Sequence, residues 1–183
     1  MKKFLFVFLA ALMLVSVCSC GNKPNETKPS DESSVSTSST VPDKKELIYD
    51  STEAFDYEEV NGGVSIIEFK NYDYNEYDKI IVPAVIDGKK VVGIGDNERD
   101  YYVFGAVFGK CEIELPDSIT FIGDYAFQGA KGLVKLSGGG NCTKIGEYAF
   151  MNCVNLSEVT FLDNVTDLAD NAFAGCTKWE STH

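Results

Sequence analysis

Residues 122–127 read IGDYAF, and the pattern returns as IGEYAF at residues 145–150 and as LADNAF at residues 168–173. Both intervals are 23 residues. Further apolar and hydroxyl positions keep the same register: Leu133 and Leu156; Ile113, Leu136 and Val159; Thr120, Thr143 and Thr166. A repeat this short cannot bury an apolar face alone, so successive repeats must stack and their repeated apolar positions form ladders. The repeat therefore predicts a solenoid.

The first coil begins at Ile94 and carries about five extra residues, within 98–102. Alternating apolar residues, as in Ile113 and Leu115, predict short strands with one face inward. The Ala-Phe pair after Ile-Gly and an acid predicts a short helical turn, with its acid near the N-terminus, where negative charge is favoured. We expect about 3.5 coils over residues 94–183, β-dominated with short helical turns.

A second β-rich unit precedes the repeats. Residues 46–78 hold ten acids and one base. Strand-like runs occur at 64–69, 79–86 and 89–94. Turn signals such as Asn-Gly-Gly and Asp-Gly separate these runs. We expect residues 46–93 to form an acidic cap over the open end of the solenoid.

The N-terminus is typical of an export signal. Two lysines precede an apolar run over residues 4–17, which is too short for a comfortable membrane span and predicts a signal peptide over residues 1–19. Residues 17–21, VCSCG, resemble the lipobox of bacterial lipoproteins, which implies a diacylglyceryl thioether on Cys20. Ordinary secretion with free release is the alternative. Residues 20–45 are rich in Ser and Thr and lack the apolar content to fold, so we expect a tether.

Composition excludes several classes of function. The 183 residues carry a net charge of -12, which argues against nucleic acid as a partner. The single histidine is His183, the last residue, which excludes Ser-His-Asp and Cys-His catalysis and disfavours His-ligated zinc. We therefore expect no enzyme activity, no catalytic residues, no metal and no cofactor.

The multi-column pattern resembles the BspA-like leucine-rich repeat proteins of bacteria, whose repeat runs I-G-x-x-A-F-x-x-C-x-x-L-x-x-V-x-L-P. The best match is residues 145–161, with Cys153, Leu156 and Val159 in their positions. The resemblance implies a short right-handed leucine-rich-repeat solenoid, and a surface role in adhesion to proteins, cells or surface polymers. Departures include the glycines at residues 138–140, which we expect to loosen one coil.

Exposed tyrosines are the best candidates for ligand contact, since a tyrosine has an apolar body and a polar tip. Two stretches carry them, the acidic loop around residues 72–78 and the insertion at 98–102; a plain connecting loop is the alternative for the first. The candidate binding residues are Tyr72, Tyr74, Tyr77, Tyr101 and Tyr102.

Four cysteines remain after the signal region, of which Cys153 and Cys176 share a column. Buried free thiols are the preferred interpretation, and a disulfide between them is the alternative. Trp179 occupies the leucine position of the last coil, where it either folds down as a plug or leaves an edge for a partner or a second copy.

Three functions remain open. The first is a lipid-anchored surface protein that displays a binding face for protein or glycan ligands outside the cytoplasm. The second is an accessory envelope lipoprotein, for which we expect a uniformly polar face without clustered aromatics. The third, a carbohydrate-active enzyme, needs two acids facing each other across a cleft.

Overall fold

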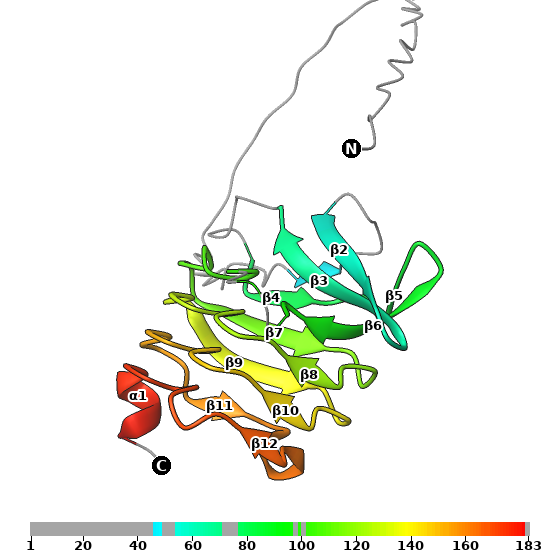
Figure 1. The fold of residues 1–183 in the computed structure, drawn as a ribbon. Helices are drawn as coiled ribbons and strands as arrows, with labels where there is room; N and C mark the ends of the chain where they lie inside the picture. The colour runs from blue at the N-terminus through cyan, green and yellow to red at the C-terminus, as the bar shows by residue number, and fades with distance from the viewer. Residues whose placement is uncertain (1–45, 49–53, 71–76, 97–98, 100–101, 182–183) are drawn as a thin grey trace, which may run out of the picture. The chain divides into compact units, whose positions relative to one another are not determined.

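The computed structural model describes residues 46–48, 54–70, 77–96, 99 and 102–181. The chain divides into two compact units, Met1–Ser39 and Thr40–His183, and every described residue belongs to the second. This unit is built from two sheets whose strands follow one another down the stack (Figure 1). No helix among the described residues is long and apolar enough to cross a membrane.

Sheet A has five strands, all parallel to their neighbours. In spatial order they are β1 (Glu46–Ile48), β4 (Lys79–Ile81), β7 (Cys111–Leu115), β9 (Leu133–Gly138) and β11 (Glu158–Val159).

Sheet B has seven strands, and its strands from the repeats belong to the same coils as those of sheet A. Its members are β12 (Asp167–Leu168), β10 (Lys144–Ile145), β8 (Phe121–Ile122), β6 (Lys89–Ile94), β3 (Gly63–Phe69) and β2 (Phe55–Val60), with β5 (Val85–Ile86) paired to β6. The β2–β3 and β5–β6 pairs are antiparallel, whereas the pairs among the repeats are parallel.

The registers of the parallel pairs follow the sequence repeat. On sheet B, Ile122 lies beside Ile145, which lies beside Leu168. On sheet A, Leu136 lies between Ile113 and Val159. Each repeat therefore gives one strand to each sheet, and the apolar columns meet between the sheets as ladders that are buried except at Leu168, which is exposed in the last coil.

Stacked phenylalanines form the centre of the core. Phe104, Phe127, Phe150 and Phe173 lie one above another, with successive ring centroids 5.0, 5.2 and 5.0 Å apart. Phe69 of β3 continues the stack above Phe104, at 5.2 Å. Since burying one such ring contributes about 1.5–3 kcal/mol, this column ties the N-terminal strands to the repeats.

The segments that follow Ile-Gly are turns, whereas the sequence predicted short helical turns. Several of their backbone N–H groups bond to the next coil: Tyr125 N–H donates to Glu147 O at 3.0 Å, and Phe127 N–H to Ala149 O at 2.8 Å. Tyr125 also has a φ of 58°, which a helix does not allow. Bonds between coils therefore add to bonds within the turn, such as Gln128 N–H to Tyr125 O at 2.9 Å. The described helices are short, namely η2 (Leu162–Asn164) and α1 (Thr177–Glu180).

The glycines at residues 138–140 do not loosen their coil. Gly138 still pairs with Leu115, at a φ of 74°. A Cβ at this position would clash with the carbonyl oxygen of Leu115. Only glycine allows the strand to end this close to the coil above, so the glycine is required by packing.

The predicted strand over residues 79–86 is two strands. β4 ends at Ile81 and β5 begins at Val85, with Pro83 between them. Proline has no N–H to donate to a ladder, so the chain leaves sheet A there.

Trp179 of α1 is buried and lies against the last phenylalanine of the column. Of the two alternatives that the sequence left open for Trp179, the structure shows the plug.

Candidate functional site

The outer face of sheet A is covered by paired charges. Lys79 Nζ lies 2.8 Å from a Glu114 carboxylate oxygen, and Lys135 Nζ lies 2.8 Å from one of Glu158. Glu112 sits beside Lys79 and Lys135 in the register, so the signs alternate from coil to coil. A face whose charges already pair with one another has little to offer a charged ligand.

A column of tyrosines runs along the turns that follow sheet B. The rings of Tyr125 and Tyr148 stack with centroids 5.3 Å apart and planes at 20°. Tyr102 meets Tyr125 edge to face at 6.0 Å and is 55% exposed, whereas the other two are half-buried. We call Tyr102, Tyr125 and Tyr148 the tyrosine column. It is a continuous aromatic surface with hydroxyl groups, as protein interfaces prefer.

The local backbone sets the direction of these rings. Tyr125 and Tyr148 both lie in the left-handed region, at φ values of 58° and 55°. Such a conformation is uncommon for a bulky residue, and its strain is sustained here by the bonds between coils and by ring stacking. The equivalent position one coil later is Asn171, where the aromatic column ends.

The predicted binding residues have different outcomes. Tyr102 belongs to the tyrosine column, while half-buried Tyr77 lies two residues before β4, at sheet A. Tyr72, Tyr74 and Tyr101 lie outside the described residues, as does the predicted lipidation site Cys20. Sequence reasoning missed Tyr125 and Tyr148, although the signal was present: residues 102, 125 and 148 are tyrosines at the same 23-residue spacing as the core.

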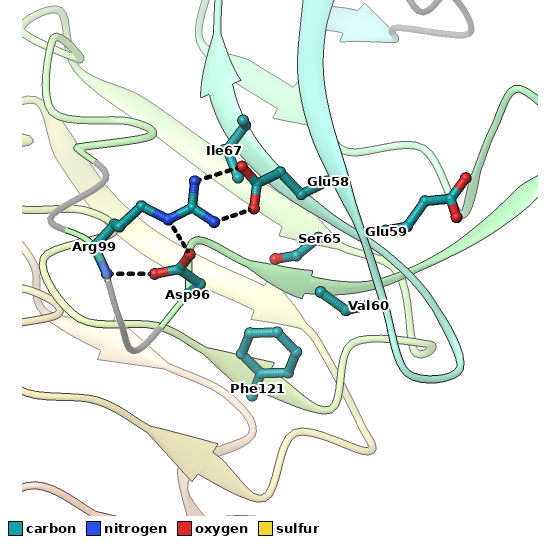
Figure 2. A pocket seen from close by; sticks show the side chains of 8 residues that line it. All are labelled: Glu58, Glu59, Val60, Ser65, Ile67, Asp96, Arg99 and Phe121. Atoms are coloured by element: carbon teal, nitrogen blue, oxygen red, sulfur yellow. Dashed lines mark hydrogen bonds and ion pairs between the residues drawn. The ribbon is translucent and has the colours of Figure 1, made fainter. Parts of the chain in front are cut away.

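A hollow of about 360 Å³ opens where the β2–β3 hairpin meets the first repeat (Figure 2). Arg99 links the residues that line this hollow. Its Nη1 and Nη2 donate to the two carboxylate oxygens of Glu58, each at 2.7 Å. Nε of Arg99 lies 3.4 Å from Asp96, whose other oxygen accepts the backbone N–H of Arg99 at 2.7 Å. This guanidinium therefore joins a hairpin and a repeat that are 41 residues apart.

The floor of this hollow is aromatic. Phe121 of β8 is half-buried and lies across Gly93 of β6, where a Cβ would fall within 3 Å of the ring. Ser65 of β3 is fully buried at the same hollow and donates its hydroxyl to Gly95 O. Glu59 points away from the other side chains in Figure 2, and its carboxylate pairs with Lys89 at 2.5 Å.

A second hollow, of about 270 Å³, lies two coils further down on sheet B. Charged side chains line it: Asp124, Lys144, Glu147 and Asp167. Lys144 Nζ is 3.5 Å from an Asp167 oxygen, and Asp124 accepts the backbone N–H of Glu147 at 2.8 Å. Each hollow is thus lined by carboxylates and one cation on a half-open sheet surface.

The first hollow bears on the alternative of a glycosidase. Glu58 and Asp96 do converge there, but the Arg99 guanidinium stands between them and bonds to both. A glycosidase needs the scissile oxygen of its substrate between two carboxyl groups, one of them protonated. Because a cation fills that place, the geometry does not favour hydrolysis.

All four cysteines in the described part of the chain are buried free thiols. The thiols of Cys153 and Cys176 donate to the carbonyls of Phe127 and Phe150, at 3.0 and 2.9 Å. The pKa of Cys153 is raised well above the ordinary thiol range, first by its hydrogen bond with Cys176 and then by burial. Burial also raises the pKa of Cys111 to about 12. These thiols act as core residues.

Among the described residues, no group of three or more His, Cys, Asp or Glu side chains is arranged to hold a metal ion.

Comparison with known proteins places the repeats in a class. Residues 100–183 match the sequence model of the BspA type leucine rich repeat region, in six copies. The fold is therefore a strand-rich leucine-rich-repeat fold with few helices. No curated protein matches the chain.

Two solved structures are similar to this chain. A leucine-rich repeat protein of T. pallidum has a TM-score of 0.59 at 23% identity, over 69% of this chain and 56% of that one. A leucine rich cell surface protein of Faecalibacterium prausnitzii has a TM-score of 0.55 at 28% identity, over 67% of this chain and 33% of that one. The chain thus spans about half and a third of these two proteins.

Proposed function

We propose that this protein is a lipid-anchored cell-surface protein that binds a protein ligand through the tyrosine column. The observation that carries the proposal is the contiguous run of Tyr102, Tyr125 and Tyr148 along three successive coils. An accessory lipoprotein without a ligand would have no need of clustered surface aromatics, because exposed rings favour association. The match to a BspA-type repeat region and the likeness to a cell surface protein support a surface role.

The binding experiment uses the purified full-length chain on an array of extracellular matrix proteins and glycans. Tyr102→Ser, Tyr125→Asn and Tyr148→Asn are combined in one variant, since asparagine tolerates the left-handed backbone at residues 125 and 148. The control is Phe108→Ser, which removes an aromatic residue that is 61% exposed and outside the column. We expect the column variant to lose protein binding about tenfold or more, and the control to keep it.

Two results would contradict the proposal. One is the absence of any protein ligand at micromolar concentration, which would favour the accessory role. The other is equal binding by the column variant and the control.

The anchor is tested separately. Cys20→Ser removes the sulfur that the thioether requires, so the chain should move from the membrane fraction to the medium and lose incorporation of labelled palmitate. Retention of both in the variant would mean that Cys20 is not the lipidated residue.

A further inference from the structure

We propose that the outer face of sheet B is a second binding site, separate from the tyrosine column, and that its ligand is an extended neutral glycan lying along the axis of the repeats. The proposal goes beyond the protein ligand above. It rests on the two hollows, on the residues that join them, and on the balance of charge around them.

The two hollows belong to one continuous surface. Phe121 lines the first hollow and Lys144 lines the second. The two residues are neighbours in the register of β8 and β10. The same register continues from Gly93 through Phe121 and Lys144 to Asp167. One ligand following this row would pass over strands β6, β8, β10 and β12, at right angles to the strands.

A row of carboxylates borders this surface, one for each coil. Asp96, Asp124 and Glu147 follow the strands of three successive coils, and backbone bonds hold them in line: Asp124 N–H donates to Asp96 O at 2.9 Å, and Glu147 N–H to the Asp124 carboxylate at 2.8 Å. Neighbouring strands are about 4.8 Å apart. This step is close to the length that one sugar ring occupies in an extended chain, so successive rings would meet successive carboxylates.

The chemistry of the first hollow suits a sugar. Carboxylate oxygens accept hydrogen bonds from hydroxyl groups, a guanidinium donates to them, and an aromatic ring packs against the C–H face of a pyranose. Glu58, Asp96, Arg99 and Phe121 bring these three kinds of group to one hollow. Its volume of about 360 Å³ is in the range of small-ligand sites.

The charge of the two hollows favours a neutral polymer over an acidic or a basic one. The second hollow has three carboxylates and one lysine, and the first has three carboxylates and one arginine, with Glu59 neutralised by Lys89. This excess of negative charge repels an acidic polysaccharide or a nucleic acid. A polycation would have to displace Arg99 and Lys144 from their carboxylate partners to gain its own ion pairs. A neutral polyhydroxyl chain requires neither.

The test is calorimetric titration of the full-length chain, held in a detergent without a sugar headgroup. The probes are neutral β-1,4-linked and α-1,4-linked hexasaccharides with their trisaccharides, an anionic hexagalacturonate, and hexalysine. We expect one neutral hexasaccharide to bind, more tightly than its trisaccharide and more tightly than either charged probe. Failure of every neutral hexasaccharide to bind at about 1 mM, or tighter binding of a charged probe, would overturn the proposal.

Two variants locate the site. Phe121→Ala removes the aromatic floor and should weaken binding about tenfold, which corresponds to about 1.4 kcal/mol. Glu147→Gln changes one exposed carboxylate of the row and should weaken binding by a smaller factor, and it remains informative if Phe121→Ala fails to fold. Glu114→Gln on sheet A is the matched control and should bind as the native chain does. If both sheet B variants bind normally, the site is not on sheet B.

The two proposals fail independently. The tyrosine-column variant should retain hexasaccharide binding, and Phe121→Ala should retain the protein ligand.

Discussion

The indole of Trp179 stacks on the ring of Phe173, with centroids 4.6 Å apart and planes at 9°. Phe173 is the last ring of the phenylalanine column, and Trp179 is 8% exposed on the short helix α1. The tryptophan therefore ends the column of the core and covers one face of its last phenylalanine, which is half-buried.

Trp179→Ala should lower the free energy of unfolding by about 3 kcal/mol, because it opens the end of the column and leaves a cavity beside Phe173. Thermal unfolding followed by circular dichroism should show a midpoint roughly 10 °C lower. Trp179→Phe keeps an aromatic ring in place and should lose less than half of this amount. An unchanged midpoint in Trp179→Ala would show that the indole contributes nothing to the core.

Gly123→Ala should be strongly destabilising, by about 2–4 kcal/mol. A Cβ at Gly123 would fall 2.2 Å from the carbonyl oxygen of Asp96 in the coil above, so the backbones of two coils must separate. Gly140→Ala is the matched control, since its Cβ would meet only the end of the Asp117 side chain, at 3.1 Å. Urea denaturation measures both variants, and equal stability of the two would contradict the packing argument.

Lys135→Glu should lower the urea midpoint, most clearly at low salt. Lys135 lies between Glu112 in the register and Glu158, to which it is paired, so the substitution brings three carboxylates together on sheet A. Added salt screens this repulsion, and the deficit should shrink as salt is raised to about 0.5 M. Lys131→Glu makes the same change of charge at an exposed turn, away from the register of Glu112 and Glu158, and should have a smaller effect. A deficit that is independent of salt would mean that repulsion is not its cause.

The buried thiols should make the protein sensitive to alkali. Burial raises the pKa of Cys111 to about 12 and that of Cys142 to about 11, from an ordinary value near 9. A raised thiol pKa means that the folded state holds its proton more tightly than the unfolded state. The contribution to stability is fully present below about pH 9 and is lost as the pH rises towards 11–12.

This behaviour is measured as the free energy of unfolding between pH 8 and pH 11 under reducing conditions. The double variant Cys111→Ala, Cys142→Ala should show a flatter profile than the native chain. Iodoacetamide at pH 8 should label none of Cys111, Cys142, Cys153 and Cys176 until urea is added, because all four thiols are buried. Labelling of the folded chain would contradict their role as core residues.

The repeat was enough to predict that the coils stack and which apolar residues form the ladders of the core. The pattern at residues 122–127 and its copies predicted which residues lie beside one another on sheet B, because a fixed period brings equivalent positions into contact whenever coils stack. The tyrosine column has the same 23-residue period, so it could have been predicted as well. It was missed because the period was used for the apolar positions of the core. The turns after Ile-Gly could not be predicted in detail, since several of their hydrogen bonds go to the next coil, as from Tyr125 to Glu147, in addition to those between near neighbours in the sequence.

The hollows on sheet B could not be predicted, because they depend on contacts between residues far apart in the sequence. Arg99 and Glu58 are 41 residues apart, and nothing in the spacing of either indicates that an insertion loop will reach back to a hairpin. The position of the Phe121 ring likewise depends on Gly93 of the neighbouring strand, which leaves room for it. A repeat fixes contacts between equivalent positions, whereas a site made where the repeats meet a non-repeating hairpin depends on contacts that have no period.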